Sequence, residues 1–213
     1  MSEEYNPATN MWDVKANMPT ARKYSAAGAV NEKIYVIVGA DRYGDPMRTN
    51  EEYDPATDIW TAKANMPTAR GDLAAAAVNG KIYALGGGNG YNSYGTNEEY
   101  NPVTNKWAKK NDLNNYRQSF AAVTMNSRIY AIGGWYQHWD SGYSFLTMTT
   151  EEYNPATNTW SEKGNIRTGR WSLAATGVNG KIYAIGGLNL NGIPVRTAEE
   201  YSPGILFYIH KQN

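Results

Sequence analysis

Residues 70–107 read RGDLAAAAVNGKIYALGGGNGYNSYGTNEEYNPVTNKW, and this stretch decides the fold because its main features return along the whole chain. A Glu-Glu-Tyr triplet ends at five tyrosines spaced by 48, 47, 53 and 48 residues, namely Tyr5, Tyr53, Tyr100, Tyr153 and Tyr201. A tryptophan stands seven residues after each of the first four, as Trp12, Trp60, Trp107 and Trp160. A repeat of this length is a supersecondary unit that buries its apolar surface by stacking on its neighbours.

One copy of the repeat predicts four antiparallel strands, which we name a, b, c and d. Strand a is alanine-rich and ends at Asn79-Gly80, a pair typical of two-residue hairpin turns in which both residues take positive φ. Strand b follows at 81–85, strand c carries the triplet at 98–100, and strand d carries Trp107. A short helix is the alternative for the alanines, since alanine is the best helix former. The shortness of the run and the turn signal that follows it favour a strand.

Units of this kind, with glycine and aromatic signatures at this period, are typical of a β-propeller, an all-β fold. Strand a would then be innermost, where a crowded centre requires small side chains such as the alanines. Trp107, on the outermost strand, would fill the wider gap between neighbouring blades. The sequence therefore predicts four-stranded antiparallel blades that pack on one another around a central axis.

The sequence resembles the kelch repeats in residues that agree at several spaced positions of each copy. In residues 70–107 these are Arg70, Gly86-Gly87, Glu99-Tyr100-Asn101-Pro102 and Trp107. The set recurs as Arg22, Tyr53 and Trp60; as Arg117, Gly133-Gly134, Tyr153 and Trp160; and as Arg170, Gly186-Gly187 and Tyr201. At Gly39-Ala40 we interpret the first copy as lacking its second glycine. The resemblance covers essentially the whole chain and implies a kelch-type β-propeller with, most often, a binding role.

The repeats predict a single propeller domain over residues 1–213. A half-blade at 1–14 holds strands c and d only, and repeats follow at about 22–60, 70–107, 117–160 and 170–209. Either the half-blade completes the last repeat and closes a four-bladed ring, or the last repeat is complete by itself, with Tyr208 standing on its strand d. Because the resemblance implies rings with more blades, a fragment of a larger propeller is favoured. Open ends would permit self-association.

Composition excludes several classes of function. Lys+Arg and Asp+Glu are equal at 20 each, so net charge selects neither nucleic acid nor an anionic membrane as partner. The chain has no cysteine, which excludes disulfides and thiolate metal sites, and we expect no metal and no cofactor. Neither a signal peptide nor an apolar run long enough to span a membrane is present in the sequence, so a cytoplasmic location is the default expectation.

Features found in every repeat are predicted to be structural. The recurring arginines Arg22, Arg70, Arg117 and Arg170 precede strand a, and the second glutamate of each triplet stands on strand c. We interpret them as buried ion pairs or arginine–carbonyl contacts that lock the blades together. A ring of arginines that binds an anion is the alternative. Acid–base or metal chemistry at Glu98-Glu99 is disfavoured, because adjacent residues of a strand point to opposite faces.

The loops between strands b and c differ in every copy, and variable loops on a rigid scaffold tend to carry binding specificity. Antiparallel alternation places these b–c loops on one face, together with the links from strand d to the next strand a. The third loop, 134–150, is the longest and most aromatic. Trp and Tyr dominate interface energetics. The predicted site residues are Arg42, Tyr43, Tyr91, Asn92, Tyr94, Trp135, Tyr136, His138, Trp139 and Tyr143.

These residues predict a non-catalytic binding or scaffold module for a protein or carbohydrate partner. The aromatics of the third loop could instead fold back and cap their own blade or its neighbour. Within the resemblance, copper radical oxidases are excluded, because they need a crosslinked cysteine and clustered histidines, and this chain has two histidines and no cysteine. A sugar-isomerising enzyme of the sialic-acid epimerase or mutarotase type, which would use Arg and Glu, stays open.

Overall fold

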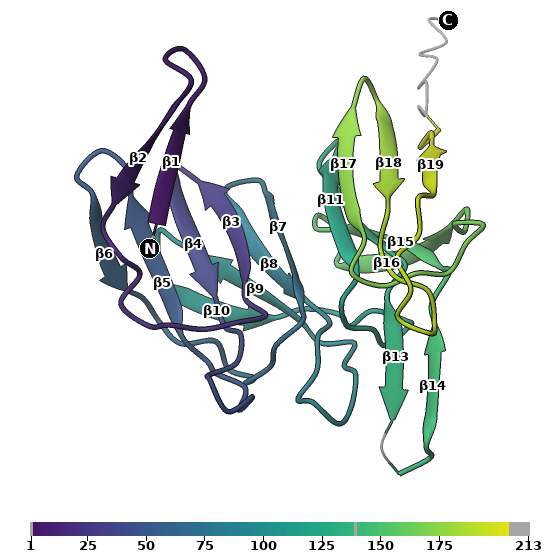
Figure 1. Cartoon of the computed structure of the whole chain (residues 1–213). Helices are drawn as coiled ribbons and strands as arrows, with labels where there is room; N and C mark the ends of the chain where they lie inside the picture. The colour runs from purple at the N-terminus through teal and green to yellow at the C-terminus, as the bar shows by residue number, and fades with distance from the viewer. Residues whose placement is uncertain (1, 139, 205–213) are drawn as a thin grey trace, which may run out of the picture.

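The computed structural model describes residues 2–138 and 140–204, and within them the chain forms strands and turns without a helix (Figure 1). Three four-stranded antiparallel sheets, which we call blades 1 to 3, follow the predicted order a-b-c-d. Blade 1 holds β3 (Ala26–Val30), β4 (Lys33–Ile37), β5 (Asn50–Asp54) and β6 (Ile59–Ala62). Blade 2 holds β7 (Ala74–Val78), β8 (Lys81–Leu85), β9 (Asn97–Asn101) and β10 (Lys106–Lys109). Blade 3 holds β11 (Ala121–Met125), β12 (Arg128–Ile132), β15 (Thr150–Asn154) and β16 (Thr159–Lys163).

Two smaller sheets flank these blades. β1 (Ser2–Asn6) pairs with β2 (Met11–Lys15), and blade 4 consists of β17 (Ala174–Val178), β18 (Lys181–Ile185) and β19 (Ala198–Tyr201). Because β19 occupies the edge of β18, the β1–β2 pair does not complete the C-terminal sheet among the described residues. Tyr208, which we expected on strand d of the last repeat, lies outside the described residues.

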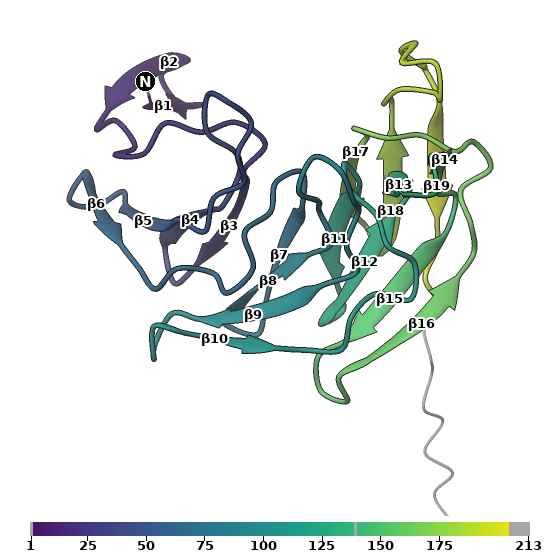
Figure 2. The same cartoon turned by 90° about the horizontal axis from the view of Figure 1, so that it is seen from below.

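The blades form an arc with β1 and β2 at one end and blade 4 at the other (Figure 2). Backbone hydrogen bonds run from blade to blade along it: Asp72 N donates to Tyr24 O at 3.1 Å, Ser119 N to Asp72 O at 2.8 Å, and Ser172 N to Ser119 O at 2.7 Å. Apolar side chains such as Ile185 are exposed on blade 4. Self-association through the ends of the arc stays a prediction.

The turns between strands a and b have the predicted geometry. Asn79 and Gly80 take φ values of 53° and 72°, which match the right-handed twist of the flanking strands. Blade 1 makes the same turn at Asn31 and Glu32, with φ values of 51° and 62°. The left-handed conformation is therefore used even where glycine is absent. Strand a of the quoted copy, β7, is a strand as predicted.

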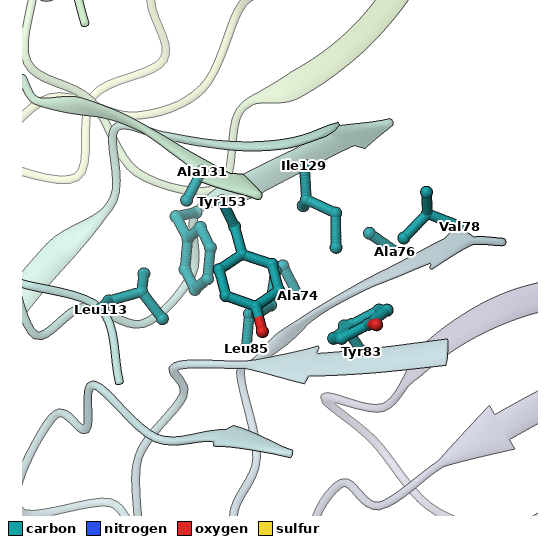
Figure 3. Packing of buried hydrophobic residues seen from close by; sticks show 10 residues of the cluster. Ala74, Ala76, Val78, Tyr83, Leu85, Leu113, Ile129, Ala131 and Tyr153 are labelled. Atoms are coloured by element: carbon teal, nitrogen blue, oxygen red, sulfur yellow. The ribbon is translucent and has the colours of Figure 1, made fainter. Parts of the chain in front are cut away.

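The core lies between blades (Figure 3). One face of blade 2 contributes Ala74, Ala76 and Tyr83, and blade 3 contributes Ile129 and Tyr153, all less than a tenth exposed. Period-two alternation places these residues on facing sides of neighbouring sheets. The alanines of strand a permit the close approach near the centre that the sequence predicted.

A buried ion pair recurs in every blade, with a partner that differs from our prediction. The arginine before strand a pairs with the first glutamate of the triplet, whereas we assigned the second. The pairs are Arg22–Glu51 (2.8 Å), Arg70–Glu98, Arg117–Glu151 (2.5 Å) and Arg170–Glu199 (2.5 Å), and all four arginine side chains are fully buried. Glu99 lies opposite Tyr83 of strand b, so Glu98, which points to the other side of strand c, faces the arginine. The arginines are therefore closed off from an anionic ligand.

The tryptophans of strand d join each blade to the preceding link. Trp107 Nε1 donates to Ala64 O at 2.8 Å, and Trp60 and Trp160 repeat the contact with Ala16 O and Asn111 O. Beside it, Asn105 Oδ1 accepts from the Tyr100 hydroxyl and from Ala64 N. Each complete blade is thus held at its outer edge as well as at the centre.

The departure in the first copy also differs from our interpretation. Val38 N and Gly86 N make equivalent bonds, to Thr49 O and Thr96 O, so Val38 stands where the first glycine is expected and Gly39 is the second. Val38 takes φ 49°, which is strained for a β-branched residue. In blade 2 neither position has room for a side chain, because a Cβ would lie 2.5 Å from Arg117 O on Gly86 and 2.6 Å from Gly71 O on Gly87. In blade 1 the first position holds Val38, whereas a Cβ on Gly39 at the second position would lie 2.5 Å from Lys23 O.

Candidate functional site

The third b–c loop forms a hairpin of its own, which the sequence did not predict. β13 (Trp135–His138) pairs with β14 (Tyr143–Leu146) as a separate two-stranded sheet. Figure 1 shows it projecting from the end of the molecule opposite the β17–β18 turn. The extra residues in this copy therefore build an ordered element on the face where the other b–c loops end.

β13 is fixed to its surroundings by backbone bonds. Trp135 N donates to Gln118 O at 3.0 Å and Gln118 N donates to Trp135 O at 2.9 Å. Two residues further along β13, Ser93 N donates to Gln137 O and Gln137 N donates to Ser93 Oγ, both at 2.9 Å. Because Ser93 belongs to the second b–c loop, the hairpin and that loop form one continuous surface.

The two sides of the hairpin have different roles. Trp135 is half-buried, and its ring lies 5.6 Å from that of Trp171 in the link to blade 4. On the other side, Tyr136 stacks on Phe145 at 4.8 Å and lies 6.5 Å from the His138 ring. One side thus packs on the neighbouring blade, as our alternative for the aromatics supposed, and the other presents rings outward.

A groove of about 510 Å³ lies along the outward side of the hairpin. Its walls are Tyr136, Phe145, Leu146, Thr147, Met148 and Thr149 from the hairpin and the link that follows it, and Asn114, Asn115, Tyr116 and Asn165 from the d–a links. None of these side chains is charged. The groove therefore combines aromatic surface with neutral amides and hydroxyls, which suits an uncharged ligand.

Sequence reasoning missed the wall formed by the link before blade 3. The links before blades 1 and 2 read Pro-Thr-Ala-Arg at 19–22 and 67–70, and the link before blade 4 reads Arg-Thr-Gly-Arg at 167–170, whereas this one reads Asn114-Asn115-Tyr116-Arg117. This change carried the same kind of signal as the long loop, because Asn115 stands where the other three links have threonine, and Tyr116 stands where they have alanine or glycine. Tyr116 is 51% exposed beside the groove.

The remaining predicted residues are only partly brought together. Tyr143 is 71% exposed near the tip of the hairpin, and Tyr94 and Asn92 are half-buried in the loop bonded to β13. Tyr91 in that loop is 58% exposed. Arg42 and Tyr43 contact each other, with the guanidinium 4.5 Å from the ring centroid, and belong to the separate first loop. Trp139 lies outside the described residues.

The paired carboxylates of strand c do not converge, as alternation predicted. While Glu98 meets Arg70, Glu99 accepts from the Tyr83 hydroxyl at 2.5 Å and from Lys81 Nζ at 2.8 Å. Burial and the hydrogen bond to Glu99 raise the pKa of Tyr83 well above its ordinary value. Burial opposes ionisation of Glu99, but hydrogen bonds from Lys81 and Tyr83 lower its pKa overall. These carboxylates stabilise the blade.

Among residues 2–138 and 140–204, no group of three or more His, Asp or Glu side chains is placed to hold a metal ion. The same residues contain no helix long and apolar enough to cross a membrane.

Comparison with known proteins supports the repeat assignment. The family model described as the KLHDC2/KLHL20/DRC7 Kelch-repeats domain matches residues 4–187. The Kelch repeat and BTB domain-containing protein 12 of Danio rerio is 38% identical over 42 residues, which are 20% of this chain and 7% of that protein. The solved structure titled "Structure of YjhT" superposes with a TM-score of 0.74 at 19% identity, covering 90% of this chain and 68% of that one. At this identity the superposition shows the fold.

Proposed function

The chain belongs to the kelch-repeat family, whose members typically bind protein partners, and we propose that it is a non-catalytic module that binds a protein on its b–c loop face. The observation that carries the proposal is the β13–β14 hairpin with its groove, because it is the largest departure from the repeat. Apart from the Gln118–Trp135 backbone pair, which has a counterpart in every blade, the hairpin is an element that the other described b–c loops lack. The site residues predicted from the sequence are part of this proposal.

The chemistry of the hairpin supports a protein partner. Tyr143, Phe145 and Tyr116 are 71%, 52% and 51% exposed, and together they give one rim of the molecule a cluster of large aromatic side chains. Aromatic residues contribute large apolar area with little loss of side-chain entropy, and they are enriched where binding energy concentrates. The neutral amides of the groove can hydrogen-bond a polypeptide backbone.

Catalysis gains less support. A sugar-isomerising enzyme would need arginine and glutamate side chains that reach a substrate. The arginines and first glutamates that recur in each repeat instead form buried ion pairs, such as Arg117–Glu151. Aromatic rings with asparagines also suit a sugar, so glycan binding is an outcome that the experiment must distinguish.

The test compares three immobilised proteins: the wild type, the hairpin variant Tyr143→Ala/Phe145→Ala, and the control Val103→Ala/Val178→Ala. Val103 and Val178 are 84% and 50% exposed and stand next to the c–d and a–b turns, on the opposite face. We expect a protein captured by wild type and control to be lost from the hairpin variant at unchanged melting temperature. Equal capture by all three, or retention of glycans but no protein on arrays, would show that the proposal is wrong.

A further inference from the structure

We propose that the free edge of β14 takes an uncharged, extended peptide segment of the partner as a third strand, with alternate side chains of the peptide in the groove. This inference rests on the proposed function, since it gives the binding mode of the same face. It follows from the backbone hydrogen bonds of the hairpin and from the lining of the groove.

The hydrogen bonds of β13 decide which groups of β14 are available. Trp135 and Gln137 direct their backbone groups away from β14, toward Gln118 and Ser93. In an antiparallel pair, residues opposite such positions also turn their N–H and C=O outward. Ser144 stands opposite Gln137 and Leu146 opposite Trp135. Their backbone groups therefore point away from β13.

Within the described part of the chain, these outward backbone groups of Ser144 and Leu146 make no backbone hydrogen bond to another segment. The β13–β14 sheet has two strands, and β14 forms its outer edge. Directly after β14, Thr147 N points back toward strand β13 and donates to Gly134 O at 2.8 Å. Donor and acceptor pairs two residues apart along an edge match the repeat of another extended backbone. A peptide strand has this pattern along its own main chain.

The lining of the groove indicates which side chains such a strand would carry. A third strand beside β14 would place every second side chain on the face that holds Tyr136 and Phe145, which is the face of the groove. The groove offers aromatic rings, the Met148 thioether and the amides of Asn114 and Asn165, and no charged side chain lines it. An apolar or amide side chain fits this lining, whereas a charged one would lose water without gaining a partner.

The edge is built to accept a strand without inviting aggregation. β14 has four residues, so it offers few ladder bonds, and short edge strands are one way in which proteins limit edge-to-edge association. Specificity must then come from the groove. We therefore expect moderate affinity, with the backbone contributing register and the groove contributing selection.

The probe is a phage-displayed random peptide library selected on the wild-type protein, followed by fluorescence anisotropy of the enriched synthetic peptide. We expect enriched sequences with uncharged residues at alternate positions. Ser144→Pro removes the outward N–H and is tolerated at an exposed strand edge, and it should weaken binding about tenfold or more. Ser144→Ala keeps the N–H and should bind within about twofold of wild type.

Methylation of backbone nitrogens in the peptide gives a second test, which does not require a protein variant to fold. N-methylation at every second residue, on the side that faces β14, should abolish binding, and methylation of the alternating set should not. Equal sensitivity at both sets, or Ser144→Pro binding as well as Ser144→Ala, would overturn strand addition. Failure of any peptide to be enriched, or pairing of β14 with a second copy by sedimentation, would also overturn it.

The outcomes separate this inference from the proposed function. If Phe145→Ala abolishes peptide binding while Ser144→Pro and the methylated peptides bind normally, the face is a binding face and the strand-addition mode is wrong. If neither Phe145→Ala nor Tyr143→Ala affects an enriched peptide, the proposed face itself is wrong.

Discussion

Replacing Trp107 with alanine tests whether the strand-d tryptophans hold neighbouring blades together. Trp107 is half-buried, packs against the cluster shared by blades 1 and 2, and lies 5.0 Å from the Tyr100 ring. Its Nε1 donates to Ala64 O, in the link that precedes blade 2, at 2.8 Å. The substitution would remove both contacts at once.

The expected cost follows from these two contacts. Truncating a fully buried aromatic costs about 3–5 kcal/mol. Because part of this ring is exposed, we expect about 2–3 kcal/mol from packing. Loss of the hydrogen bond adds about 1 kcal/mol. The free energy of unfolding should fall by about 3–4 kcal/mol, which corresponds to a melting temperature lower by roughly 10 °C in a domain of this size.

Trp12→Ala is the matched control. Trp12 occupies the same repeat position and faces Tyr5 at 5.2 Å, but it is 65% exposed on β2. We expect a loss of less than about 1 kcal/mol, as for other exposed side chains. Urea unfolding followed by tryptophan fluorescence and calorimetry measures both variants. Equal effects of the two substitutions would refute the account of blade packing.

Three further predictions concern stability. Arg117→Met should cost about 3–5 kcal/mol in urea unfolding, because it leaves the Glu151 charge buried without its partner; Glu151→Gln in the same chain should restore part of the loss, and no recovery would contradict the ion-pair argument. Burial raises the pKa of Tyr100 and of Tyr153 to about 12. Their contribution to the free energy of unfolding is therefore complete below about pH 10 and is lost as pH rises toward 12, by about 1.4 kcal/mol per pH unit for each tyrosine. A free energy of unfolding that stays constant between pH 10 and 12 would contradict this prediction. Trp135→Ala should lower the melting temperature by several degrees, because its ring packs on the blade 4 link, and a variant as stable as wild type would show that this contact contributes little.

The sequence predicted what each copy repeats. Asn79-Gly80 fixed the a–b turn because few residue pairs accept two positive φ values. The alanines of β7 and Trp107 indicated the inner and outer strands, because side-chain size must follow the width of the gap between blades. Agreement of the same positions across several copies supplied the information that one copy alone would lack.

Pairing within a copy was harder to predict. The repeat places Glu98 and Glu99 side by side, and the sequence does not state which face of strand c meets Arg70. Once strand c is paired with strand b, Glu99 is fixed opposite Tyr83, and Glu98 opposite Ala84 can reach the arginine. The error thus arose from register, which depends on tertiary pairing.

The sequence drew attention to the loop on which the candidate site lies, but only some of the residues that line its groove were among those we named. The length of the third loop drew attention to Trp135 and Tyr143. The turn signal at Ser141-Gly142, where Gly142 takes φ 65°, was not used to predict that the ends of this loop pair as strands. Tyr116 escaped notice because we examined the b–c loops for departures and read the d–a links only for the recurring arginine. Comparing every link across the copies would have identified it.

Hydrogen–deuterium exchange of the protein with and without its captured partner tests the central claim most directly. We predict that protection upon binding is concentrated in residues 143–148 and 114–116, with the amides of Ser144 and Leu146 among the most protected, while the a–b turns at Asn79-Gly80 and Asn179-Gly180 are unchanged. Protection centred on those turns, with exchange of the β13–β14 hairpin unaltered, would contradict the account.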